Sequence, residues 1–185
     1  MLASASPRRA ELLASWGQVF ERAPTNIEER VAAGETPRAT CLRLAEEKAA
    51  AAATGRQSGT VLGSDTIIEI DGELLGKPAD ADGARAMLQR LAGRRHHVVT
   101  SVALLHVPSG TCVSDLSASE VEMKPNGWLD DYVACGEWEG KAGAYAIQGV
   151  AASFSRVVSG SMDTVIGLPR ELVVRLAARL DEETR

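Results

Sequence analysis

Apolar residues recur along the chain either every three to four positions or every second position, which predicts a mixture of helices and strands. Five stretches have the helical spacing. They run from Pro7 to about Trp16, from Pro37 to Gly55, from near Asp80 to Gly93, after Asn126, and after Pro169. Ser6-Pro7 and Thr36-Pro37 are typical helix starts, because a hydroxyl can cap the first turn and proline presets its first dihedral angle.

The strand-like stretches are rich in β-branched residues and lie between these helices. They cover Met1 to Ala3, Thr60 to Ile70, His97 to Val107, Cys112 to Met123 and Ser153 to Val158, with a short strand between Gly72 and Gly76. Pro108-Ser109-Gly110 predicts a hairpin between two of them. Because helices and strands alternate while a hairpin is present, we expect one α/β domain over residues 1–185, with a twisted mixed sheet flanked by helices.

Composition fits such a domain, since 45% of the 185 residues are hydrophobic and 24% are charged. No run approaches the roughly 20 apolar residues that span a bilayer, so we expect no membrane association. The opening MLASASPRRAELL also lacks the order of a signal peptide. The three cysteines form no CxxC pair, and we interpret them as small core residues of a cytoplasmic protein.

The net charge of the chain limits the classes of ligand that it is expected to bind. A net charge of -5 argues against a nucleic-acid-binding surface, which needs a basic face to neutralise phosphates. A few cations gathered in one cleft can nevertheless bind a small anion, because the local field decides. Ser4 to Arg9 offers such a place: two serines and two arginines lie at a predicted helix start, where free N–H groups favour an anion. The alternative is a capped helix with two solvated arginines.

Asp65 is the second candidate, since it lies inside the apolar run VLGSDTII. A carboxylate in such a run must be paired, bind a metal or lie at an exposed strand end. The functional interpretation is a metal ligand or a general base for water, and the alternative is a turn aspartate.

Other candidates are weaker when taken alone. Lys77, in Gly76-Lys77-Pro78, and Lys48, on the second helix, could reach a phosphate or remain solvated. Glu29 could supply a second metal carboxylate or form part of the surface. Gln148 follows small residues in KAGAYAIQG, which suits close approach to a base edge. His96 and His97 point to opposite faces of a strand, so we interpret them as structural.

Taken in order, five stretches resemble the Maf family of nucleotide pyrophosphatases, relatives of the inosine triphosphatase-like house-cleaning enzymes. They are LASASPRRAELL from Leu2, GSDTIIEI from Gly63, GKP from Gly76, KAGAYAIQG from Lys141 and GSMDTVIGLP from Gly160. The resemblance covers nearly the whole chain and implies the fold of that family. It also implies a homodimer.

The resemblance implies a role for each matching position. Asp65 resembles the catalytic proton acceptor. Glu29 corresponds to a carboxylate on the metal side, so that it and Asp65 would hold Mg²⁺ or Mn²⁺. The positions implied to bind phosphate are Ser6, Arg9, Lys48 and Lys77.

Substrate choice is implied by three further positions, Arg8, Thr66 and Gln148. The combination of SPRR, DT and IQG resembles the dTTP/UTP branch, which converts the triphosphate into monophosphate and pyrophosphate. Ala146 stands where the family pattern has glycine, which predicts a slightly tighter base pocket. Two alternatives remain: a modified-purine nucleotide pyrophosphatase on the same fold, and a binding protein that arrests septum formation.

Overall fold

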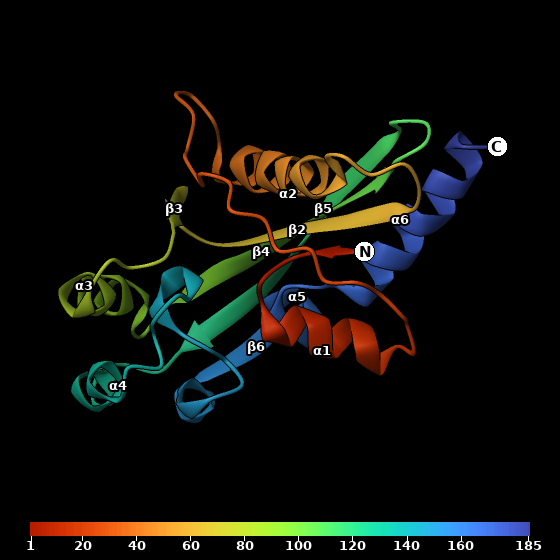
Figure 1. Ribbon diagram of the computed structural model, residues 1–185. Helices are drawn as coiled ribbons and strands as arrows, with labels where there is room; N and C mark the ends of the chain where they lie inside the picture. The colour runs from red at the N-terminus through yellow and green to blue at the C-terminus, as the bar shows by residue number, and fades with distance from the viewer.

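A six-stranded mixed sheet lies at the centre of the computed structural model, which describes residues 1–185 (Figure 1). The strands follow the order β1 (Leu2–Ala3), β2 (Thr60–Ile70), β4 (Arg95–His106), β5 (Cys112–Met123) and β6 (Ser155–Ser159), and β3 (Glu73–Leu75) pairs with β2. β1 runs parallel to β2, and all other neighbouring strands are antiparallel. The predicted mixed α/β sheet and its hairpin are confirmed.

The outer edge of β2 is covered in two separate places. β1 pairs with residues 62–63, whereas β3 pairs with residues 68–70. Residues 64–67 therefore keep a free edge between the two short strands. Because successive side chains of a strand point to opposite faces, Asp65 and Thr66 diverge at this gap.

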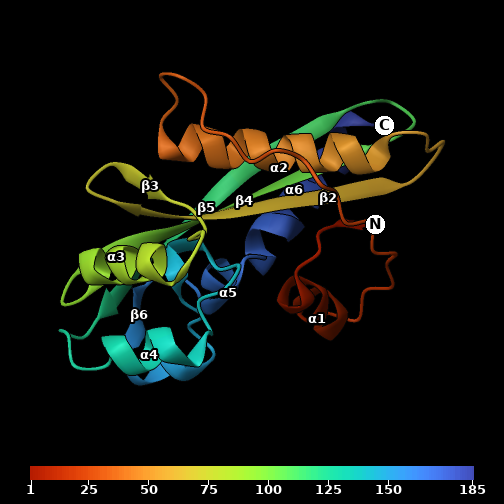
Figure 2. The ribbon, with the colours of Figure 1, turned by 60° about the vertical axis from the view of Figure 1, so that its left-hand side comes forward.

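Helices cover both faces of the sheet, as the two views show (Figures 1 and 2). One face carries α2 (Pro37–Ala53), whose alanines pack on β1, β2 and β4. The helices of the other face are α1 (Pro7–Ser15) and α6 (Arg170–Glu183) near the start of β2, α5 (Met162–Ile166) near its middle, and α3 (Ala81–Leu91) and α4 (Leu129–Cys135) near its end. Two short 3₁₀ helices, η1 (Ala142–Ala144) and η2 (Val150–Ser153), follow α4.

Helix α2 lies very close to β2 because Gly63 has no side chain. A Cβ atom at this position would lie 2.1 Å from the carbonyl oxygen of Ala45 and 2.8 Å from the amide nitrogen of Ala49. Glycine is therefore required for this approach. The close contact brings Lys48, on α2, beside Asp65, two residues along β2 from Gly63.

The five predicted helices are confirmed, and three details differ. Ser6 occupies the N-cap position of α1, but its side chain accepts no capping hydrogen bond; the Oγ of Ser4 instead accepts one from the Ser6 amide at 3.2 Å. The short helix α5 was not predicted. Among the cysteines, only Cys41 is buried, so the interpretation of Cys112 and Cys135 as core residues is wrong. The latter two lie at the start of β5 and the end of α4, where side chains reach solvent.

None of the helices is both long enough and apolar enough to cross a membrane.

Candidate active site

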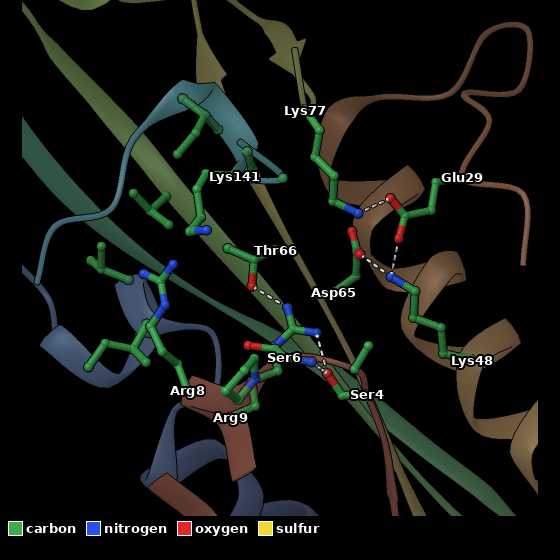
Figure 3. A pocket seen from close by; sticks show the side chains of 18 of the residues that line it. Ser4, Ser6, Arg8, Arg9, Glu29, Lys48, Asp65, Thr66, Lys77 and Lys141 are labelled. Carbon is green, nitrogen blue, oxygen red and sulfur yellow. Dashed lines mark hydrogen bonds and ion pairs between the residues drawn. The ribbon is translucent and has the colours of Figure 1, made fainter. Parts of the chain in front are cut away.

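A cavity of about 790 Å³ opens at the free edge of β2 (Figure 3). Side chains from both faces of the sheet contribute to it, because Asp65 and Thr66 point to opposite faces there. The lining contains eight of the nine side chains to which the sequence assigns a role: Ser6, Arg8, Arg9, Glu29, Lys48, Asp65, Thr66 and Lys77. Gln148 does not line the cavity and is exposed, so its role stays a prediction.

On the α2 side, two carboxylates and two ammonium groups form one connected cluster. Lys48 donates from Nζ to Asp65 Oδ1 at 2.6 Å and to Glu29 Oε1 at 2.7 Å. Lys77 donates to Glu29 Oε2 at 2.7 Å. Asp65 lies in the middle of β2 with 6% of its surface exposed, so the interpretation of a turn aspartate is wrong.

The electrostatics of this cluster favour the ionised form of Glu29. Burial alone would raise the pKa of Glu29, but hydrogen bonds from Lys48 and Lys77 outweigh it and lower that pKa to about 2. One oxygen of Asp65 is held by Lys48, whereas Oδ2 makes no hydrogen bond to the protein. Asp65 therefore keeps one oxygen for a ligand or a water molecule.

Between the two sides lies Arg9, whose guanidinium group binds neutral oxygens only. Nη1 donates to the Ser64 carbonyl at 2.7 Å and to Ser4 Oγ at 3.4 Å, and Nη2 donates to Thr66 Oγ1 at 2.8 Å. Burial lowers the pKa of Arg9, although an arginine stays protonated. Its Nε–H and one Nη2–H have no acceptor in the protein.

The hydroxyl of Thr66 is fixed by a chain of hydrogen bonds across the sheet. Thr100, the register partner of Thr66 on β4, donates its hydroxyl proton to the Thr164 carbonyl at 2.7 Å. The 2.9 Å contact between the two threonine hydroxyls must therefore be a bond that Thr66 donates. Because Thr66 also accepts from Arg9, the chain locks both groups against α5.

On the far side of Arg9, the cavity contains Arg8 and Lys141 (Figure 3). Arg8 makes no hydrogen bond or ion pair within the protein, and Lys141 donates only to the Glu139 carbonyl, at 3.0 Å. Burial and then the charge of Arg8 lower the pKa of Lys141. Sequence reasoning noted the small residues that follow Lys141 but gave this lysine no role.

The loop that carries Lys141 is anchored to the fold at three points. The amide of Gly143 donates to the Gly76 carbonyl at 2.9 Å, next to Lys77. The amide of Ala146 donates to the hydroxyl of Tyr132 at 3.1 Å. The Tyr145 hydroxyl lies 2.8 Å from His96 Nε2, and both side chains are buried. The structural interpretation of His96 is consistent with this contact.

The donor set on the α2 side fits a divalent ion that is bound together with a triphosphate. No group of three or more His, Cys, Asp or Glu residues forms a separate metal centre. Asp65 and Glu29 nevertheless converge on a single cation, the ammonium group of Lys48. Mg²⁺ commonly takes one or two protein carboxylates and completes its shell with water and substrate phosphates. Asp65 and Glu29 are therefore the residues that would hold such an ion.

The chain matches one family model and several curated proteins that share a name. A family model described as Maf-like protein matches residues 1–180. A dTTP/UTP pyrophosphatase of Cereibacter sphaeroides is 47% identical over 183 residues, which covers 96% of this chain and 93% of that protein. Proteins of the same name from Anaeromyxobacter dehalogenans and Escherichia coli are 46% and 45% identical; each match covers 91% of this chain, and 87% and 86% of those proteins.

Proposed function

The chain belongs to the Maf family, and from this membership and the geometry of the cavity we propose that it hydrolyses dTTP and UTP to the monophosphate and pyrophosphate. The observation that carries the proposal is the cluster at the free edge of β2, where Asp65 and Glu29 meet Lys48 and Lys77. Such a cluster holds a base and cations ready for a triphosphate without reorganisation.

Asp65 acts on the water molecule in this proposal. Lys48 holds Oδ1, so that Oδ2 faces the ligand and accepts a proton from water as the water attacks the α-phosphorus. The bond between the α-phosphorus and the bridging oxygen breaks, and pyrophosphate leaves with the electron pair of that bond. A positioned base of this kind contributes about 10²- to 10⁴-fold to a rate.

The cations stabilise the charge that collects on the leaving group. Lys48 and Lys77 approach it from the α2 side, and the unpaired N–H groups of Arg9 approach it from the other. Ser6, at the start of α1, adds the free amides of a helix N-terminus. A divalent ion bound by Asp65 and Glu29 would neutralise phosphate oxygens and make the phosphorus more electrophilic.

Pyrophosphate release from a panel of nucleoside triphosphates with Mg²⁺ or Mn²⁺ tests the proposal. We expect hydrolysis led by dTTP and UTP, and a loss of at least about 10²-fold in turnover for Asp65→Asn. Asp115→Asn is the matched control, because Asp115 pairs with Arg175 on the surface, away from the cavity.

Three results would contradict the proposal. Near-normal turnover of Asp65→Asn would remove the catalytic role of this carboxylate. Hydrolysis led by a methylated purine nucleotide would move the enzyme to another substrate class. Absence of all hydrolysis in the wild-type protein would favour a binding role instead.

A further inference from the structure

The charges of the cavity are not evenly matched. Its lining has two carboxylates, Glu29 and Asp65, and five cations, which are Arg8, Arg9, Lys48, Lys77 and Lys141. Both carboxylates are engaged by Lys48 and Lys77 on the α2 side. The unmatched positive charge therefore lies on the α1 side, in a protein whose overall charge is -5.

Arg8 and Lys141 are the least satisfied of these cations. Arg8 has no partner, and two of the three protons on Lys141 Nζ have no acceptor in the protein. Glu137 and Glu139 are close enough to act on Lys141 through their charge, but neither forms an ion pair with it. The carboxylate of Glu137 instead accepts from the amides of η2. Arg8 and Lys141 are thus neighbours that line the cavity, and their free N–H groups have no acceptor within the protein.

The surroundings of this pair are largely apolar. The other side chains at this end come from the loop around η1 and from α5: Ala142, Tyr145, Ile147, Val165 and Ile166. The lining near Glu29 includes instead the polar residues Thr25 and Asn26, which precede it in the chain. Apolar walls with a few fixed donors are typical of sites for a flat organic ring. A phosphate chain suits the polar end better.

From these contacts we infer that Lys141 and Arg8 bind a carbonyl oxygen of the pyrimidine ring, so that Lys141 selects uracil and thymine over cytosine. This inference rests on the function proposed above and adds a specificity residue to it. The oxygen at position 4 of uracil or thymine is an acceptor, whereas cytosine carries an amino group there. Lysine and arginine only donate, so they bind the carbonyl and leave the amino group without an acceptor.

The position of Lys141 suits the base of a nucleotide whose phosphates lie at the α2 end. Lys141 and Arg8 lie on the side of Thr66 opposite to Glu29, Lys48 and Lys77 (Figure 3). A nucleotide whose α-phosphate lies at Asp65 can therefore extend its base toward Lys141. The anchors at Gly143, Tyr145 and Ala146 hold the loop in place, so that the lysine is positioned before the ligand binds.

The test is kcat/KM of Lys141→Met for UTP and for CTP, which differ at position 4 of the same ring. We expect kcat/KM for UTP to fall about 10- to 100-fold, the value of a hydrogen bond to a charged group, and that for CTP to change little. Lys141→Arg should keep the preference for UTP. Lys124→Met is the matched control, because Lys124 also donates to a backbone carbonyl, that of Ser153 at 2.8 Å, but lies outside the cavity.

Inorganic triphosphate, used as a competitive inhibitor, separates recognition of the ring from recognition of phosphate. We expect its inhibition constant to be the same in the wild type and in Lys141→Met. An equal fall for UTP and CTP together with weaker inhibition would overturn the inference, because Lys141 would then bind phosphate. An unchanged ratio of UTP to CTP would overturn it as well.

The proposed function has its own readout, the turnover of UTP by the wild type. If the wild type hydrolyses neither nucleotide, the proposed function fails, and calorimetric Kd values for UTP and CTP still test Lys141. A loss of UTP affinity in Lys141→Met that CTP does not share supports the inference, and equal affinities in both proteins overturn it.

Discussion

The cavity has two ends that differ in charge. At the α2 end every charged side chain has a partner of opposite sign. At the other end, called the α1 end, the cations Arg8, Arg9 and Lys141 contact neutral oxygens or have no partner. Lys48, Glu29, Lys77 and Asp65 form an unbroken chain of ion pairs. Across the cavity, Arg8 and Lys141 have no carboxylate within ion-pair distance. The charges of the first end are therefore matched in the free protein, whereas the donors of the second end have no acceptor within the protein.

This difference separates two tasks. Ion pairs that are already formed keep a base and its cations in place during a reaction, which lowers the cost of reorganisation. Donors without acceptors discriminate instead, because only a ligand with oxygen at the right position satisfies them. We therefore expect substitutions at the α2 end to lower stability and turnover, and substitutions at the α1 end to change affinity and preference.

The largest effect should come from Lys48→Met. It leaves Asp65, whose side chain is 8% exposed, without its ion-pair partner, and we expect the free energy of unfolding to fall by about 3 kcal/mol. Turnover should fall at least about 10²-fold, because Asp65 Oδ1 is no longer held. Urea denaturation and initial rates under saturating UTP measure the two effects.

Lys77→Met is the internal control for that prediction. Lys77 binds the same glutamate at the same 2.7 Å, but its side chain is 51% exposed, so its loss should cost less than about 1 kcal/mol. If Lys48→Met and Lys77→Met lower the free energy of unfolding equally, the burial of Asp65 does not make the loss of Lys48 more costly. The comparison between the ends of the cavity would then lose its energetic basis.

A smaller effect should follow from Thr100→Val, which keeps the shape of the side chain and removes the hydroxyl that orders Thr66 and Arg9. The buried Thr164 carbonyl loses its donor, and we expect a loss of about 1 to 2 kcal/mol in the free energy of unfolding. KM for UTP should rise several-fold while kcat changes less, since Thr66 no longer fixes Arg9. Steady-state kinetics with UTP separate the two constants.

Two variants show whether Thr100 acts on the site or only on stability. Thr100→Ser restores the hydroxyl and should restore KM. Ser155→Ala removes another buried hydroxyl, which donates to the Ala151 carbonyl at 2.7 Å far from the cavity. It should lower stability in a similar way and leave KM unchanged, so a rise in KM for Ser155→Ala would make the Thr100 effect nonspecific.

The parts of the structure that the sequence predicted are those with strong local signals. The strand-forming residues of β2 and β5 predicted the observed bounds of both strands, and Thr36-Pro37 predicted the start of α2. Helix α5 has only five residues, too few to show a helical period, although Ser161 caps it through the Thr164 amide at 3.2 Å. Local patterns therefore predict long elements and miss short ones.

The contacts that form the cavity could not be predicted from local patterns, because they join residues that are far apart in the sequence. Asp65 and Lys48 were each suspected, but their contact depends on the missing side chain of Gly63, which lets α2 approach β2. The hydroxyl chain through Thr66, Thr100 and Thr164 depends on the register of β2 against β4 and on where α5 lies. Lys141 was quoted within a motif, but only the fold shows that Arg8 lies beside it.

The smallest effect should be the acid dependence that Glu29 confers. Its pKa is about 2 in the folded protein and 4.5 in the unfolded chain, so its ion pairs stabilise the fold fully above about 4.5. That stabilisation is lost as the pH falls through 4.5 toward 2. Because the side chain is 34% exposed and solvent screens the pairs, we expect the effect to be about 1 kcal/mol or less.

Unfolding of the wild type and of Glu29→Gln at pH 7 and pH 3 measures this contribution. The stability difference between the two proteins should shrink at pH 3, because Glu29 is then mostly protonated in the unfolded chain and still mostly ionised in the folded protein. Glu35 provides the control, because hydrogen bonds, the largest from Arg43, also lower its pKa to about 2, but it lies outside the cavity. Glu35→Gln should alter stability over the same acid range while leaving KM for UTP unchanged.

Glu29→Gln should raise KM, because Lys48 and Lys77 lose the carboxylate that positions them. If both variants raise KM alike, the change reflects stability, and the matched charges at the α2 end do not organise the site.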